Sequence, residues 1–208
     1  MAMPRRFGQI LLAVLLGSAA AAAHSSTAPS GEAIASAASA QVGVTLSYDP
    51  AYTRIGYPGG DLPIDRGVCT DVVVRAFRAV GVDLQVLVHE DMRAHFRDYP
   101  DKWHMSRTDS NIDHRRVPNL QRYFARQQRA VPVSASASDY QAGDVVSWRL
   151  PKGLDHVGVV SARRSGAGAD SRPLVVHNIG RGAREEDVLF AWPQTGHYRW
   201  FATAGTRR

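Results

Sequence analysis

The chain has 208 residues, enough for one domain with its own hydrophobic core. It is 44% hydrophobic and 21% charged, with a formal net charge of +6 at pH 7, a composition typical of a soluble globular protein. No stacking aromatic residues are spaced among the basic ones, so we expect no nucleic-acid partner. The mild positive charge instead suits an anionic neighbourhood such as a cell-wall polymer or a membrane surface.

The N-terminus has the pattern of an export signal. Arg5 and Arg6 precede a short apolar run over 10–16, and alanines over 19–23 offer small-residue cleavage sites. The alternative is an uncleaved membrane anchor, but the run is short for a span, and no later run is long enough for one. We predict a signal peptide over 1–23, a linker over 24–30, one folded domain over 31–208, and a periplasmic or secreted location without a stable membrane span.

Helical signals fill the first part of this domain. The sequence predicts helices over 32–41, 69–80, 89–96 and 117–128, because apolar residues recur at helical spacing in the second of them and glycines follow the first two. Residues 48–65, rich in Gly, Pro and Asp, predict a long loop before the second helix.

Short β-prone runs fill the second part. They cover residues 144–148, 156–160, 173–177 and 197–203, and the Gly/Ser/Arg-rich residues 161–172 predict an exposed hairpin tip. Helices followed by an antiparallel sheet are the layout of an α+β fold, with the N-terminal helices packed on a small sheet.

Cys69 is the single cysteine, so no internal disulfide can form. A free thiol in an oxidising compartment is either buried and inert, or kept because its reactivity is useful. Cys69 opens a predicted helix, where unpaired N–H groups and the helix dipole stabilise a thiolate. We therefore expect its pKa to be lowered.

Two histidines could serve such a thiol. His156 opens an apolar strand and could accept the thiol proton, although a single histidine is more often structural. His177 ends the next predicted strand, and adjacent antiparallel strands can bring their histidines side by side. His177 would then orient the imidazole of His156, and Asn178 is the alternative for that role.

These residues resemble the core of the NlpC-type papain-like cysteine peptidases. In that class a Gly-Asp turn precedes the strand that carries the base histidine, as in Gly143-Asp-Val-Val146 and His156-Val-Gly-Val-Val160. The longer pattern resembles the bacterial domain of unknown function 1287 family, which is related to that class. Its hallmarks here are Tyr57-Pro-Gly-Gly-Asp61, Arg66-Gly-Val-Cys-Thr-Asp71, Asn111-Ile-Asp-His-Arg-Arg-Val-Pro-Asn119 and Val176-His-Asn-Ile-Gly180.

The resemblance implies a papain-like α+β fold and a thiol-dependent amidase or peptidase of the Cys-His-His type. Cys69 would be the nucleophile, His156 its base and His177 the orienting residue. The implied partner is peptidoglycan or its peptide fragments, without a cofactor or metal, and we expect a monomer. The residues expected to bind substrate are Tyr57, Asp71, His114, Arg115 and Asn178.

Two other hypotheses stay open. A metal-dependent hydrolase would use His114, His156 and His177, with Asp113 or Asp155, as zinc ligands, although no HExxH motif is present. A non-catalytic wall-binding module would keep the fold without the reaction.

Overall fold

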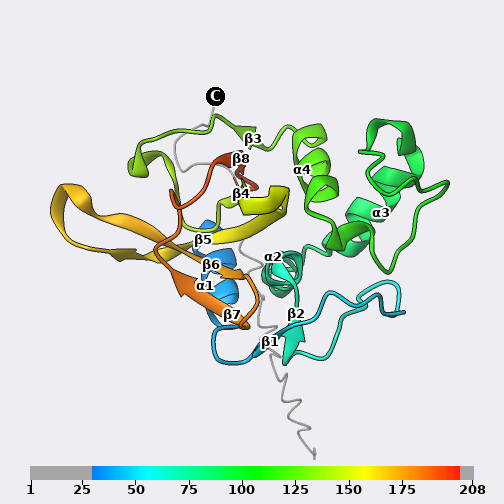
Figure 1. The fold of residues 1–208 in the computed structure, drawn as a ribbon, viewed down its shortest axis with the longest axis horizontal. Helices are drawn as coiled ribbons and strands as arrows, with labels where there is room; N and C mark the ends of the chain where they lie inside the picture. The colour runs from blue at the N-terminus through cyan, green and yellow to red at the C-terminus, as the bar shows by residue number, and fades with distance from the viewer. Residues whose placement is uncertain (1–29, 202–208) are drawn as a thin grey trace, which may run out of the picture.

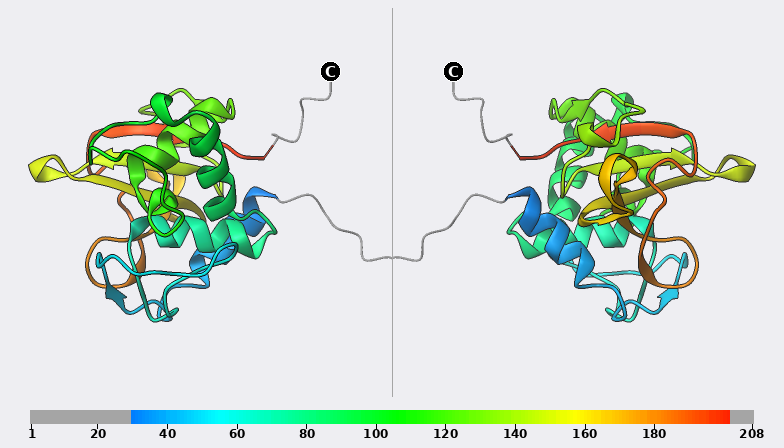
Figure 2. Two further views of the ribbon diagram at one scale, coloured as in Figure 1. Left: turned by 90° about the vertical axis from the view of Figure 1, so that its right-hand side faces the viewer. Right: turned by 90° about the vertical axis from the view of Figure 1, so that its left-hand side faces the viewer.

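The computed structural model describes residues 30–201, in which four α-helices accompany a six-stranded antiparallel sheet (Figure 1). The predicted signal peptide and residues 24–29 of the predicted linker lie outside this range. Within it, none of the helices combines the length and apolar character needed to cross a membrane. The two ends of the described chain lie side by side, with Gly31 against the ring of Phe201 (Figure 2).

The helices form where the sequence predicts them, with one shifted start. The third begins at Leu84, five residues earlier than expected, because the Asp83 side chain caps it by accepting a hydrogen bond from the Gln85 N–H at 3.0 Å. The α-helices are α1 Gly31–Ser39, α2 Cys69–Ala79, α3 Leu84–Ala94 and α4 Val117–Arg126. Short 3-10 helices are η1 Phe96–Asp98, η2 Asp113–Arg115, η3 Ala137–Asp139, η4 Pro151–Gly153 and η5 Gly168–Asp170.

The main sheet has the strand order β3-β8-β4-β5-β6-β7, and all its pairings are antiparallel. Its strands are β3 Ala130–Val131, β4 Val145–Arg149, β5 Asp155–Ser165, β6 Arg172–Asn178, β7 Ala183–Glu186 and β8 Gln194–Tyr198. A separate parallel pair, β1 Ser47–Tyr48 and β2 Arg66–Gly67, precedes α2. The predicted α+β class is confirmed, but the edge strand β7 was not predicted, because Ala-Arg-Glu-Glu lacks apolar alternation.

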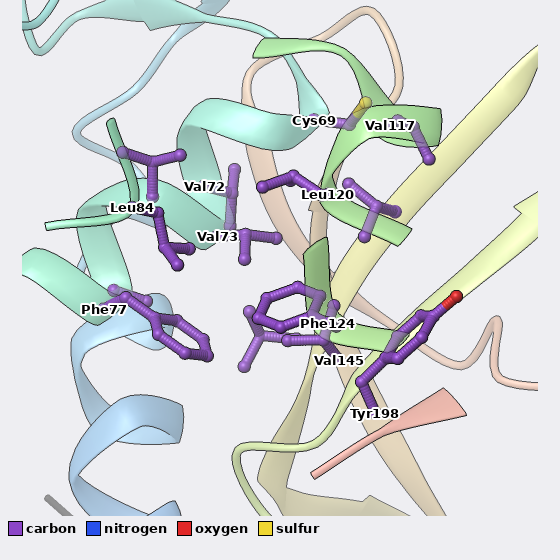
Figure 3. Close-up of a cluster of buried hydrophobic side chains, with 14 of the residues drawn as sticks. Cys69, Val72, Val73, Phe77, Leu84, Val117, Leu120, Phe124, Val145 and Tyr198 are labelled. Atoms are coloured by element: carbon purple, nitrogen blue, oxygen red, sulfur yellow. The ribbon is translucent and has the colours of Figure 1, made fainter. Parts of the chain in front are cut away.

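The sheet separates two hydrophobic clusters. Neighbouring residues on β4 point to opposite faces, with Val145 in the larger cluster and Val146 in the smaller one. The larger cluster lies between the sheet and the helices, where Phe77 of α2 meets Phe124 of α4 at 5.8 Å between ring centroids (Figure 3). The smaller cluster, on the other face, centres on the fully buried Trp148.

Strands β5 and β6 stay close beyond the last residue pair of their ladder. The pairing begins at Val159↔Val176, so the first four residues of β5 pair in register with β4 alone. Gly158 lies just beyond the ladder, and a Cβ there would come within 2.7 Å of a Val175 methyl and 3.1 Å of the His177 Cβ. Only glycine fits this close approach, which brings the start of β5 next to the end of β6.

The Gly143-Asp144 turn fixes the start of β4 through a buried charge. The fully buried Asp144 accepts hydrogen bonds from Arg199 at 2.8 and 2.6 Å, from His197 at 2.7 Å and from the Gln141 N–H at 2.8 Å. Burial alone would raise the pKa of this carboxyl, but Arg199 and His197 outweigh it and hold the pKa below its usual value.

We predict that Asp144→Asn lowers the free energy of unfolding by about 3 kcal/mol, because it leaves the guanidinium of Arg199 without its buried counter-charge. Since the folded pKa is lowered, the stabilisation is complete above the unfolded value of about 3.9 and is lost as the pH falls below it. Urea unfolding of both proteins at pH 7 and pH 3 measures this. A difference in stability that stays the same at both pH values contradicts the assignment.

Candidate functional site

Cys69 is the first residue of α2, and its position is set by the residues on either side. Val68 before it is extended and serves as the N-cap position. Asp71 in the first turn accepts a hydrogen bond from the Val68 N–H at 2.7 Å, which satisfies one of the free amides at this helix end. The helix start, and with it the thiol, is therefore held by a local contact.

Asp71 is held in turn by Arg115. The two form a buried bidentate ion pair, with Nε–Oδ1 at 3.0 Å and Nη2–Oδ2 at 3.1 Å. Arg115 also donates to the carbonyls of Asp49 and Ala51, at 3.3 and 3.4 Å. One guanidinium thus joins the start of α2 to η2 and to the loop after β1.

A cavity of about 410 Å³ opens in front of Cys69. Aromatic, apolar and charged side chains from five parts of the chain surround it. They are Tyr48, Pro50, Val68, Cys69, Trp103, Ile112, Arg115, Arg116, Val117, Pro118, Gly153, Leu154 and Asp155. The guanidinium of Arg116 lies over the Trp103 ring, 4.1 Å from its centroid, and forms one wall.

The thiol itself is buried, and Cys69 is only 5% exposed. Burial raises the pKa of the thiol to about 12, while a hydrogen bond from the backbone N–H of Val157 acts in the opposite direction. The expected lowering is thus reversed, because desolvation outweighs the helix end. The contact also places the sulfur beside the residue that directly follows His156.

His156 and His177 form a buried pair where the start of β5 lies next to the end of β6. The Nε2 of His156 lies 2.8 Å from the Nδ1 of His177, and the residues are 2% and 1% exposed. The indole of Trp148 stacks on His156, and Trp192 contacts both rings edge-on. Burial and the neighbouring His177 lower the pKa of His156 to about 3, so it is a neutral base at pH 7.

The histidine pair lies behind the cavity rather than in its wall. Neither ring lines the space in front of Cys69, and both belong beside the smaller cluster on the sheet face of Trp148. Within residues 30–201, the Nδ1 of His156 has no hydrogen-bond partner, whereas Nε2 is taken by His177. Nδ1 is also the ring nitrogen nearer to the main chain, and the next residue, Val157, donates its N–H to the sulfur.

Among the other residues expected to bind substrate, Tyr57 and Asn178 have side-chain hydrogen-bond partners within the fold, and His114 is buried. The Tyr57 hydroxyl donates to Glu90 at 2.7 Å, and Tyr57 does not line the cavity. His114 is buried in η2 at 1% exposure, and burial lowers its pKa to about 3. Asn178 donates to the carbonyls of Gly67 at 2.9 Å and Ser47 at 3.1 Å, which holds the β1–β2 pair in place before Cys69.

The ligand set of the metal hypothesis does not come together. No group of three or more His, Cys, Asp or Glu side chains suited to a metal ion occurs in the described part of the chain. Asp113 is paired with His89 at 3.0 Å, and Asp155 with Lys102 at 2.7 Å. His114 belongs to η2, which packs on α3 and α4, while His156 and His177 belong to the sheet.

Several residues at the site were not predicted. Tyr48 and Trp103 line the cavity from a strand end and a loop, where sequence periodicity carries no signal. Glu186 lies 3.0 Å from the Nε2 of His177 through its Oε2. The glycines at 180 and 182 could have indicated a hairpin after His177, which would have placed the following strand beside it.

Fold and site together define an α+β domain with a buried cysteine at a helix start and a histidine pair on the adjoining sheet. The chain belongs to the family described as domain of unknown function DUF1287, whose model matches residues 35–200, as the motifs predict. It is 61% identical over 169 residues to a protein of Escherichia coli (strain K12) described as "Uncharacterized protein YijF", and the match covers 81% of each chain. Among solved structures, NlpC1 from Trichomonas vaginalis matches 83% of this chain at 14% identity and a TM-score of 0.44, and the chain spans 45% of its length.

We predict that the adjacent Arg115 and Arg116 respond differently to the same substitution. Arg115→Ala leaves the buried Asp71 unpaired, so it should lower the free energy of unfolding by about 3–5 kcal/mol. Arg116→Ala removes the contact with the Trp103 ring and should cost less than about 1 kcal/mol. Denaturant unfolding of both variants checks this, and equal losses would show that Arg115 does not anchor the helix start.

Proposed function

We propose that the protein is an exported cysteine hydrolase, an amidase or peptidase that cleaves amide bonds in peptidoglycan peptides. The observation that carries the proposal is the thiol of Cys69, which opens on a cavity and meets the backbone N–H next to His156. The N-terminal export pattern, the mild positive charge and the resemblance to wall peptidases support the substrate class and a periplasmic or secreted location.

In the proposed reaction, thiol and imidazole both begin neutral. The sulfur of Cys69 attacks the substrate carbonyl while the Nδ1 of His156 accepts the thiol proton. His156 then returns the proton to the leaving amine, which leaves a thioester on Cys69. Water, deprotonated by the same imidazole, hydrolyses the thioester and restores the thiol.

The carbonyl oxygen gains negative charge during attack and needs donors nearby. The backbone N–H of Cys69, at the start of α2, is one candidate. The hydroxyl of Tyr48, which lines the same cavity, is the second. Burial, Cys69 and Asp71 raise the pKa of Tyr48 to about 12, so it keeps its proton at pH 7 and can donate it in a hydrogen bond.

Arg116 is the candidate for binding a substrate carboxylate. Both arginines line the cavity, but Arg115 is paired with Asp71, whereas Arg116 forms no salt bridge among residues 30–201. A second cavity, of about 250 Å³, shares Arg116 and Trp103 with the first and has Met92, Phe96 and Tyr99 in its walls. A peptide could therefore present a carboxylate to Arg116 and an apolar group beyond it.

We predict that the purified protein releases peptide fragments from bacterial wall and that Cys69→Ala abolishes the release. Cys69→Ser should fold with little loss of stability, because the side chains are similar in size, and should also be inactive. The measurement is mass analysis of the soluble fragments, with circular dichroism as the folding control. Full activity of Cys69→Ala, combined with loss on adding a chelator, would instead support the metal-dependent alternative. Binding without cleavage by the unaltered protein would support the wall-binding module.

We predict that hydrolysis stays nearly constant from pH 8 to pH 5, because a base with a pKa of about 3 remains neutral over that range. The charged or titratable groups around the pair are His177 and Glu186 beside His156, and Asp71, Tyr48 and Arg115 beside Cys69.

The thiol gives a separate prediction. Because burial raises the pKa of Cys69 to about 12, Cys69 in the free protein should alkylate with iodoacetamide at pH 7 far more slowly than free cysteine. Faster alkylation would reveal a preformed thiolate and would contradict the neutral starting state.

A further inference from the structure

The second ring nitrogen of His177 has a partner of its own. Its Nε2 lies 3.0 Å from the Oε2 of Glu186, while its Nδ1 lies 2.8 Å from the Nε2 of His156. Three side chains from three neighbouring strands, β5, β6 and β7, therefore form one continuous hydrogen-bonded chain. The inner two are buried, whereas the Glu186 side chain is 35% exposed.

The register of the hairpin explains this contact. Val175 of β6 is directly opposite Glu186 of β7, and His177 is two residues farther along on the same face. Glu186 therefore reaches His177 across the diagonal of the strand pair. Glu185, the preceding residue, points to the other face and contacts Ser39, Ser161 and Arg163.

The hydrogen-bond chain has one consistent arrangement of protons. An ionised carboxylate only accepts, so the Nε2 of His177 must carry a hydrogen. The Nδ1 of a neutral His177 is then a lone pair and accepts the hydrogen on the Nε2 of His156. A neutral His156 that carries its hydrogen on Nε2 has its free lone pair on Nδ1, the nitrogen that the proposed reaction uses as base.

We propose that Glu186 is a positioning residue that acts through His177 to fix the tautomer of His156, so that Nδ1 is available to take the thiol proton. This inference rests on the proposed function and extends it by one residue. When His156 takes the proton from Cys69, the Glu186 carboxylate at the far end of the hydrogen-bonded chain also stabilises the new positive charge. The proton binds to Nδ1 of His156 until it passes to the leaving amine, and the two hydrogen bonds of the chain keep their donors throughout.

Glu186 also lines a cavity of about 460 Å³ together with Arg163, Arg181 and Arg184. The competing explanation is that its carboxylate serves only to offset these surface arginines. The two explanations differ in what they predict for the imidazole protons, because a surface charge would leave the tautomers of His156 and His177 unchanged.

The test labels the histidines with ¹⁵N and reads, by long-range ¹H–¹⁵N correlation, which ring nitrogen of each carries hydrogen. We expect Nε2–H for both His156 and His177 in the unaltered protein, and mixed tautomers in Glu186→Ala. In wall digestion, Glu186→Ala should lose about 10- to 100-fold in kcat with KM nearly unchanged. Glu186→Gln can still accept the hydrogen bond, so it should keep the tautomers and lose less activity.

Glu185→Gln is the matched control, because it changes the charge one residue away on the opposite face of β7. It should keep both the tautomers and kcat. Unchanged tautomers and unchanged kcat in Glu186→Ala would overturn the inference, as would Nδ1–H on His156 in the unaltered protein. Since the spectrum needs no substrate, failure of wall digestion by the unaltered protein would count against the proposed function and leave the tautomer result readable.

Discussion

The buried ion pair of Asp71 and Arg115 is the contact on which the site depends. Asp71 lies in the first turn of α2 and Arg115 is the last residue of η2. The ion pair therefore fixes the helix that carries Cys69 against the segment that lines its cavity. Arg115 also binds two carbonyls of the loop after β1. Because breaking one half of such a pair leaves an uncompensated buried charge, these segments cannot separate without a large loss of stability.

Burial gives the candidate site its chemical character. The same exclusion of water raises the pKa of the thiol and lowers that of the imidazole, so each group rests in its neutral form. For the proposed reaction, a neutral pair avoids the free energy of maintaining a buried charge before substrate binds. It also requires that the imidazole present the correct nitrogen, because a neutral ring accepts a proton at one position only. Hydrogen bonds behind the ring therefore matter as much as its distance from the sulfur.

The sequence was sufficient to predict the layout of the domain and the residues that could carry chemistry. Helical spacing after Cys69 predicted α2, and β-prone runs around His156 and His177 predicted adjacent strands, since both signals are local. The sequence was insufficient for β7, whose polar residues form an edge strand only because β6 pairs with it. It was equally insufficient for the arginines, since Arg115 and Arg116 are chemically identical and differ only in the partners that folding supplies.

What the sequence by itself determined is the order of the chemical groups: a lone cysteine at a helix start, then two histidines on successive strands, in a family that the motifs identify. Only the tertiary structure decided which nitrogen is free, which arginine is occupied and whether the thiol rests protonated. Each of these depends on partners far apart in the chain, such as Cys69 with Val157 and His177 with Glu186. Protonation follows from burial and neighbouring charges, and these exist only once distant segments have packed together.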